Sequence, residues 1–255
     1  RSEPPLSLYG TAAPVMAGAI GSCAAPVDLA ATFVEHVTLL DGIRRAVAPS
    51  TQVLHARGCG ITGADTRGFA QAVEAARKAD VAVVCVGTRS GLVEGSTSGE
   101  SSDRADLGLP GVQEQLVEAV VATGTPVVVV LVNGGVLAIP WIAEHASAVL
   151  EAWLPGEEGG NAIADVLFGV VNPSGRLPVS LPRSVGQVPV YYNHKPSGGR
   201  TNWRGNYVDL PATPLYPFGH GLSYTRFEYG ELSLSETQVP AGGAVEIDVD
   251  VTNAG

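Results

Sequence analysis

The sequence has no cluster of basic residues and no hydrophobic run long enough to cross a membrane. Its 15 Lys and Arg against 25 Asp and Glu give a formal net charge of −10. Nucleic acids and anionic membranes attract basic patches, so we expect neither as a partner. A membrane-spanning helix needs roughly 18 consecutive apolar residues, whereas VVVVLV at 127–132 is short and is closed by Asn-Gly-Gly. This run therefore predicts a buried strand.

Motifs for metal and serine-hydrolase sites are also missing, and the signal for a nucleotide site is weak. Cys23, Cys59 and Cys85 show no CxxC or other metal-ligand spacing, and no paired His or Asp motif indicates a metal. The sequence contains no GxxxxGK[ST] motif, and a lone GxGxxG spacing, GCGITG at 58–63, is too weak a signal to favour a nucleotide-binding domain. It also lacks the GxSxG elbow of an α/β-hydrolase. We expect no metal and no cofactor, and we expect Cys85, inside an apolar strand, to be a structural thiol. The cysteines predict no disulfide framework and leave the cellular compartment open.

What the sequence does contain, from about residue 52, is an alternation of strand and helix patterns. The predicted strands are 52–59, 81–87, 125–134 and 147–153, and the predicted helices are 67–80, one opened by Pro110, 140–146 and 159–169, the last closed by Gly169. Repeated β-α units with nearly continuous apolar strands predict an α/β fold, with a mostly parallel sheet sandwiched by helices. We expect 81–86 and 127–132 to be its buried central strands.

The pattern changes after Gly169. Residues 171–224 are rich in Pro, Gly, Tyr and Asn and predict a long, loop-rich wrap. From about Phe227, alternation and turn residues predict the first strands of a truncated β-sandwich. The chain begins with Arg and stops in mid-pattern, so we expect it to be a piece of a longer protein. Residues 1–40 carry no clear period and receive no prediction.

A loop rich in Ser and Gly, residues 95–111, follows the predicted strand at 81–87. Loops at the carboxyl ends of strands carry the chemistry of many α/β proteins. Glu100 is the first candidate there, as a general acid/base on an adjustable loop, although a solvated loop glutamate would show the same pattern. Glu94 is a weaker candidate. Asp103 and Arg104 are interpreted as a local ion pair that holds the loop.

Packing and capping explain the remaining motifs better than ligand binding does. In PGEEGGNAIAD, glycines precede a helix N-terminus, which can attract phosphate. However, Glu157 and Glu158 would repel an anion. His145 is interpreted as a helix-end residue, and His194 and His220 are expected to make structural hydrogen bonds.

Taken together, four segments resemble glycoside hydrolase family 3. They are SGESSDRADLGLPGVQ, TPVVVVLVNGGVLAIPWIAEHASAVLEAWLPGEEGGNAIADVLFG, NPSGRLPVSLPRSVGQVPVYYNHKPSGGR and PLYPFGHGLSYTRFEYG. The likeness runs in order from about Leu39 to Tyr229. It implies the family's second domain, an α/β sandwich, at 1–224 with a linker from about 171. It further implies an incomplete fibronectin-III-like domain at 225–255.

The resemblance also implies a role for Glu100, which occupies the position of the family's general acid/base. The implied activity is that of a retaining, exo-acting β-glycosidase that hydrolyses terminal β-linked glucose from oligosaccharides or glycosides. A β-xylosidase of the same family is the alternative. The family's nucleophile is an Asp in an SDW-like motif of an N-terminal barrel, and no such motif occurs in this sequence. We therefore expect the nucleophile to lie outside this chain, and the isolated chain to be inactive without the barrel.

A non-catalytic carbohydrate-binding or interaction fragment is the competing class of function. Four aromatic side chains can stack on sugar rings, although such residues more often pack a long loop. They are Trp203, Tyr207, Tyr191 and Tyr192. The IAVIGP-type first strand of the family has no clear counterpart in residues 1–21. Without the barrel and a whole third domain, we expect exposed apolar surface, and either marginal stability or self-association of the isolated chain.

Overall fold

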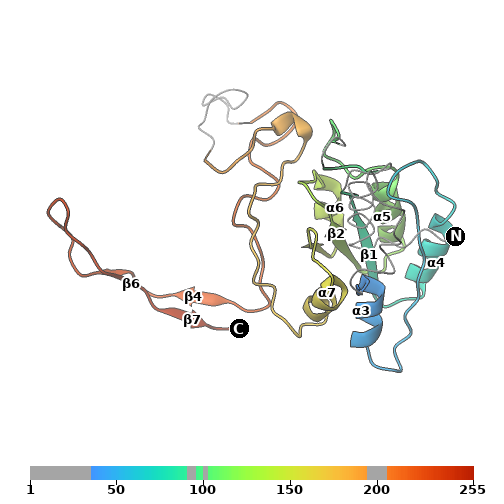
Figure 1. The fold of residues 1–255 in the computed structure, drawn as a ribbon, viewed down its shortest axis with the longest axis horizontal. Coiled ribbons are helices and arrows are strands. Elements are labelled where there is room, and N and C mark those ends of the chain that lie inside the picture. Colours follow the sequence, from blue (N-terminus) through green and yellow to red (C-terminus); the bar gives the residue numbers. More distant parts are fainter. Residues whose placement is uncertain (1–35, 91–95, 100–102, 194–205) are drawn as a thin grey trace, which may run out of the picture.

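The computed structural model describes residues 36–90, 96–99, 103–193 and 206–255 (Figure 1). In this part of the chain, three parallel strands form one sheet in the order β1-β2-β3. They are β1 (Ala82–Gly87), β2 (Val127–Val132) and β3 (Ala148–Glu151). The predicted parallel sheet is therefore confirmed, and β2 is its central strand.

Helices cover both faces of this sheet, as predicted (Figure 1). One face carries α4 (Phe69–Arg77), α5 (Gln113–Val121) and α6 (Pro140–His145), and the other carries α3 (Leu39–Ala46) and α7 (Gly159–Leu167). Successive side chains of a strand point to opposite faces. Val129 and Leu131 accordingly pack under the first group of helices, and Val130 and Val132 pack under the second. β2 is thus buried on both sides, which explains its continuous apolar sequence.

Two strand predictions need correction. Within the described residues β1 pairs only with β2, so it lies at the edge of this three-stranded sheet and not at its centre, and Val81 before it is 50% exposed. Residues 52–59 form no strand. Gly58 adopts a φ of +72°, which interrupts an extended conformation. A Cβ at this position would lie 2.5 Å from a methyl group of Leu116, because the segment crosses closely over α5.

The glycines of PGEEGGNAIAD allow α3 and α7 to approach each other, which confirms the packing interpretation. A Cβ on Gly160 would lie 2.1 Å from the carbonyl oxygen of Thr38, and a Cβ on Gly42 would lie 2.0 Å from that of Gly160. The Gly160 N–H also donates to the Val37 carbonyl over 3.1 Å. α7 then ends as predicted, because Gly169 follows it with a φ of +75°.

After α7 the described chain is irregular apart from one 3-10 turn, η1 (Val185–Gln187). Two limbs of this wrap are joined by backbone pairing of Leu181 with Tyr216. The Gln187 amide adds bonds to the carbonyls of Pro211 and Thr213, at 2.8 and 3.2 Å. The predicted loop-rich wrap is confirmed. No helix in the described ranges is long and apolar enough to cross a membrane.

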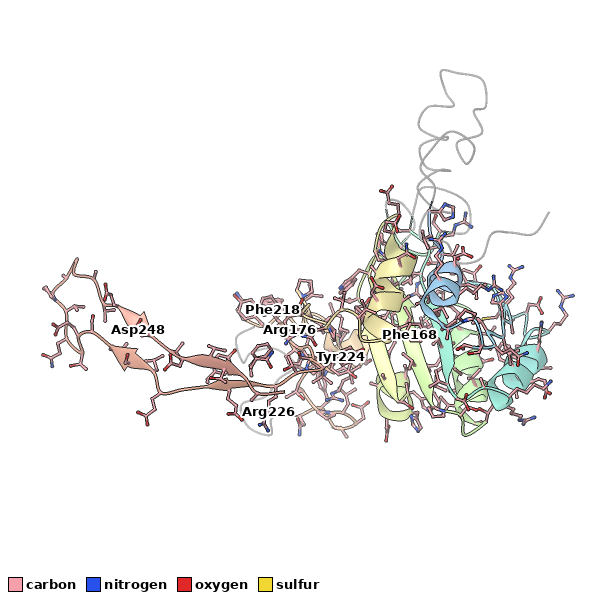
Figure 2. All side chains as sticks on the ribbon, turned by 90° about the horizontal axis from the view of Figure 1, so that it is seen from below. Phe168, Arg176, Phe218, Tyr224, Arg226 and Asp248 are labelled. Carbon is pink, nitrogen blue, oxygen red and sulfur yellow. The ribbon has the colours of Figure 1, made fainter. Side chains whose placement is uncertain are left out.

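Residues 226–255 form an arm that projects from the α/β body (Figures 1 and 2). It holds two antiparallel pairs, β4 (Phe227–Tyr229) with β7 (Val251–Asn253), and β5 (Ser233–Leu234) with β6 (Ile247–Asp248). Tyr224 lies where the arm joins the body (Figure 2), and its hydroxyl donates to the Val166 carbonyl of α7 over 2.8 Å. The arm's apolar side chains are exposed, with Tyr229 at 74% and Ile247 at 60%.

Candidate functional site

The carboxyl ends of the three parallel strands meet at one edge of the sheet, and a polar residue stands at each end. Thr88 follows β1, Asn133 follows β2, and Glu151 is the last residue of β3. In open α/β sheets this edge is where ligands bind. The predicted acid/base Glu100 and its weaker rival Glu94 both lie outside the described residues. The chain on both sides of Glu100 is described.

The segment that leads to Glu100 is bound to the end of β1. The Thr97 N–H donates to the Arg89 carbonyl over 2.8 Å, and the Arg89 N–H donates to Thr97 Oγ1 over 2.9 Å. The Ser98 hydroxyl donates to Thr88 Oγ1 over 3.3 Å. Gly99 then has a φ of +112°, a conformation that favours glycine. Thr97 and Ser98, three and two residues before Glu100, are therefore fixed against the carboxyl edge of the sheet.

The segment that follows Glu100 returns to the same edge. Arg104 Nη2 donates to the Gly108 carbonyl over 2.6 Å, and the Leu107 carbonyl accepts the Ala138 N–H over 2.8 Å. Within the described residues no ion pair joins Asp103 to Arg104. The predicted ion pair is therefore wrong. The guanidinium stabilises its own loop through a backbone carbonyl instead.

Gln113, which the sequence interpretation missed, fixes the last residue of β1. Its side chain is 1% exposed. Oε1 accepts the Gly87 N–H and Nε2 donates to the Gly87 carbonyl, both over 2.8 Å. Nε2 also donates to the carbonyls of Pro110 and Ile61, at 3.1 and 3.0 Å. The sequence held one signal for this role, which is that a glutamine stands among the apolar residues of α5.

Asn133, Glu151 and Trp153 form a second polar cluster at this edge. The Asn133 N–H donates to the Trp153 carbonyl and the Trp153 N–H donates to Glu151 Oε1, both over 3.1 Å. Asn133 Nδ2 lies 3.5 Å from Glu151 Oε2. Burial raises the pKa of Glu151 to about 7, although the bonds from Trp153 and Asn133 act in the opposite direction. Trp153 has a φ of +50°, a strained conformation for a non-glycine residue.

The other predicted polar residues have structural surroundings. The ring of His145 stacks on Trp141 at 4.2 Å, and its Nδ1 lies 2.8 Å from the Trp141 carbonyl oxygen. His220 stacks on Tyr216 at 4.7 Å. Burial raises the pKa of Cys85 to about 12, as expected for a structural thiol. The described residues contain no group of His, Cys, Asp and Glu that could hold a metal ion.

The aromatic candidates for sugar stacking lie on the wrap. Tyr192 is 72% exposed and stacks on Phe218 at 4.8 Å, and Figure 2 labels Phe218 between the arm and the α/β body. Tyr191 is 53% exposed. His194 and Trp203 lie outside the described residues, and Tyr207 is half-buried.

Residues 5–224 match the glycosyl hydrolase family 3 C-terminal domain. A β-xylosidase from Formosa agariphila is 45% identical over 220 residues, which cover 86% of this chain and 30% of that protein. A periplasmic β-glucosidase from Salmonella typhimurium is 42% identical over 247 residues, covering 87% of this chain and 32% of the relative. The chain thus spans about a third of the length of these relatives.

Solved β-glucosidases share the fold. A β-glucosidase from Erythrobacter marinus superposes with a TM-score of 0.74 at 39% identity, over 87% of this chain and 32% of that one. A β-glucosidase from Listeria innocua in complex with isofagomine gives 0.73 at 34% identity, over 86% and 30%. A mutant of the Listeria innocua enzyme was solved in complex with laminaribiose.

Proposed function

The chain belongs to glycosyl hydrolase family 3, and from this premise we propose that Glu100 is the general acid/base of a retaining, exo-acting β-glycosidase. One observation carries the proposal. The SGESSDR loop that matches the family's acid/base motif leaves and rejoins the carboxyl edge of a parallel sheet, held there by Ser98 and Leu107. This is the edge at which such sheets place their chemistry.

The chemistry requires two carboxyl groups, of which this chain supplies one. In a retaining glycosidase they lie about 5–5.5 Å apart on opposite sides of the scissile bond. Protonated Glu100 donates its proton to the glycosidic oxygen as the bond to the anomeric carbon breaks. The nucleophile forms a covalent bond to that carbon. Glu100, now a carboxylate, removes a proton from water, whose oxygen displaces the nucleophile and releases the sugar.

We assign the nucleophile to an Asp outside this chain, on an N-terminal barrel, because the sequence contains no SDW-like motif. The same assignment makes the isolated chain inactive. Residues 225–255 are proposed as the beginning of a fibronectin-III-like domain, which the antiparallel pairs of the arm support. We propose that the domain boundary lies between residues 224 and 225.

The substrate is proposed to be a terminal β-linked glucose of an oligosaccharide or glycoside. Three of the solved and curated relatives described above are named β-glucosidases. The 45%-identical relative named β-xylosidase supports a second candidate, release of terminal xylose. Turnover of 4-nitrophenyl β-glucoside and β-xyloside by the complete enzyme separates the two. The acid/base role is tested by replacing Glu100 with Ala and measuring whether azide restores turnover.

A further inference from the structure

Thr88 connects three segments at the carboxyl edge of the sheet. Its N–H continues the β1–β2 pairing by donating to the Val132 carbonyl over 3.0 Å. Its hydroxyl oxygen accepts the Gly134 N–H over 3.2 Å and the Ser98 hydroxyl over 3.3 Å. A hydroxyl oxygen has two lone pairs, so it can accept both bonds. The side chain is 6% exposed, and water competes little for these bonds.

Gly134, whose N–H donates to Thr88, lies in the turn after β2, and the Asn133 cluster holds this turn. Asn133 Nδ2 donates to the Gly135 carbonyl over 2.8 Å, which fixes the turn that contains Gly134. The backbone of Asn133 is bonded to Trp153, whose N–H is bonded to Glu151. Contacts therefore run without interruption from the end of β3 to the end of β1.

Ser98 is fixed by packing as well as by its hydrogen bond. A Cβ on Gly134 would lie 3.4 Å from Ser90 Oγ and 3.6 Å from Ser98 Oγ, so the β2 turn lies directly against the loop. Ser90 and Ser98 also form a backbone bridge. These contacts fix Ser98, which lies two residues before Glu100 in the sequence, relative to the sheet.

We propose that Thr88 is a positioning residue for the reaction, which holds Ser98 and thereby sets where Glu100 presents its carboxyl group. Asn133 and Glu151 hold Thr88's partner turn in place. The inference rests on the proposed function of Glu100. Thr88 itself touches neither the substrate nor the transferred proton, and acts through the Ser98 and Gly134 bonds.

Thr88→Val tests this in the complete enzyme, because valine keeps the shape and removes the acceptor. Misplacement by about 1 Å can cost on the order of 100-fold in rate, so we expect kcat/KM for an alkyl glucoside to fall by about 10- to 100-fold. A 2,4-dinitrophenyl glucoside needs little protonation of its leaving group and should lose less than about threefold. Thr88→Ser keeps the hydroxyl and should restore both rates.

A double-mutant cycle separates positioning from general structural damage. In a Glu100→Ala background, Thr88→Val should cause no further loss on the alkyl glucoside, because the group that it positions is gone. Glu144→Gln, an exposed change on α6, is the control and should change kcat/KM for neither glucoside. If Thr88→Val fails to fold, Ser98→Ala removes only the Ser98–Thr88 bond and is measured in the same way.

Equal losses on both substrates, or an undiminished loss in the Glu100→Ala background, would overturn the positioning role. If Glu100→Ala itself shows no leaving-group dependence, the proposed function fails. If Glu100→Ala shows that dependence and neither Thr88→Val nor Ser98→Ala does, only the role of Thr88 fails.

Discussion

The side-chain amide of Gln113 forms two hydrogen bonds to the backbone of Gly87, one in each direction and both 2.8 Å long. Gly87 is the last residue of β1, and Thr88 follows it. Gln113 thus replaces, at the strand end, the partners that a further strand residue would provide. These two bonds connect the first turn of α5 to the end of β1, which precedes the loop that contains Glu100.

We predict that Gln113→Leu loosens this strand end. The substitution leaves the Gly87 N–H and carbonyl unpaired in a buried site, and each such group costs about 1–3 kcal/mol. Hydrogen–deuterium exchange of peptides covering 82–90 should become faster. Gln115→Leu, an exposed change two residues along α5, is the matched control. Unchanged exchange in Gln113→Leu would show that the pair does not hold the strand end.

Much of the α/β body was predictable because its signals are local. The apolar run Val127–Val132 indicated a buried central strand, and the glycines at the start of α7 indicated packing rather than ligand binding. The Gln113 and Asn133 clusters were not predictable, because their partners lie far away in sequence. Gln113 meets Gly87 26 residues away and Ile61 52 residues away. Sequence periodicity does not report such pairings.

The error at residues 52–59 has the same origin. The sequence QVLHARGC was interpreted as a strand, but Gly58 takes a φ of +72° where the chain crosses Leu116 on α5. The prediction of a central position for β1 used only its apolar content. A strand's place in a sheet depends on pairing with other segments, which its own residues do not encode.

We predict that Glu151→Gln removes a pH-dependent loss of stability. The folded-state pKa of Glu151, about 7, lies above the ordinary value of 4.5, so the folded protein binds this proton more tightly than the unfolded chain does. The stabilisation is complete below about pH 4.5 and is lost as the pH rises through about 7. Glutamine resembles the neutral carboxyl group. The thermal midpoint of Glu151→Gln should therefore exceed that of the wild type at pH 8, and the difference should vanish near pH 4.5.

Glu144→Gln on exposed α6 is the control for this experiment, and its difference from the wild type should not change with pH. A constant difference between Glu151→Gln and the wild type from pH 4.5 to 8 would contradict the raised pKa of Glu151.

We predict that the 255-residue chain self-associates through the arm when it is expressed alone. Tyr229 and Ile247 stand exposed on β4 and β6, and exposed apolar surface promotes association. Sedimentation velocity should detect oligomers that dissociate in the double variant Tyr229→Ser, Ile247→Ser. Val170→Ser changes a side chain of the body that is 72% exposed and should leave them intact. A monomeric wild-type chain at tens of micromolar would refute this prediction.

The most direct test of the account is the response of Glu100→Ala to leaving group and azide in the complete enzyme. Hydrolysis of an alkyl glucoside should fall by about 100-fold or more, since general acid catalysis contributes 10²–10⁴-fold, whereas an activated aryl glucoside should react much faster than the alkyl one. Azide attacks the glycosyl intermediate without a base, so it should restore turnover and yield a β-glucosyl azide. Glu94→Ala should show neither effect. Wild-type rates of Glu100→Ala on the alkyl glucoside, or azide rescue in Glu94→Ala instead, would contradict the assignment.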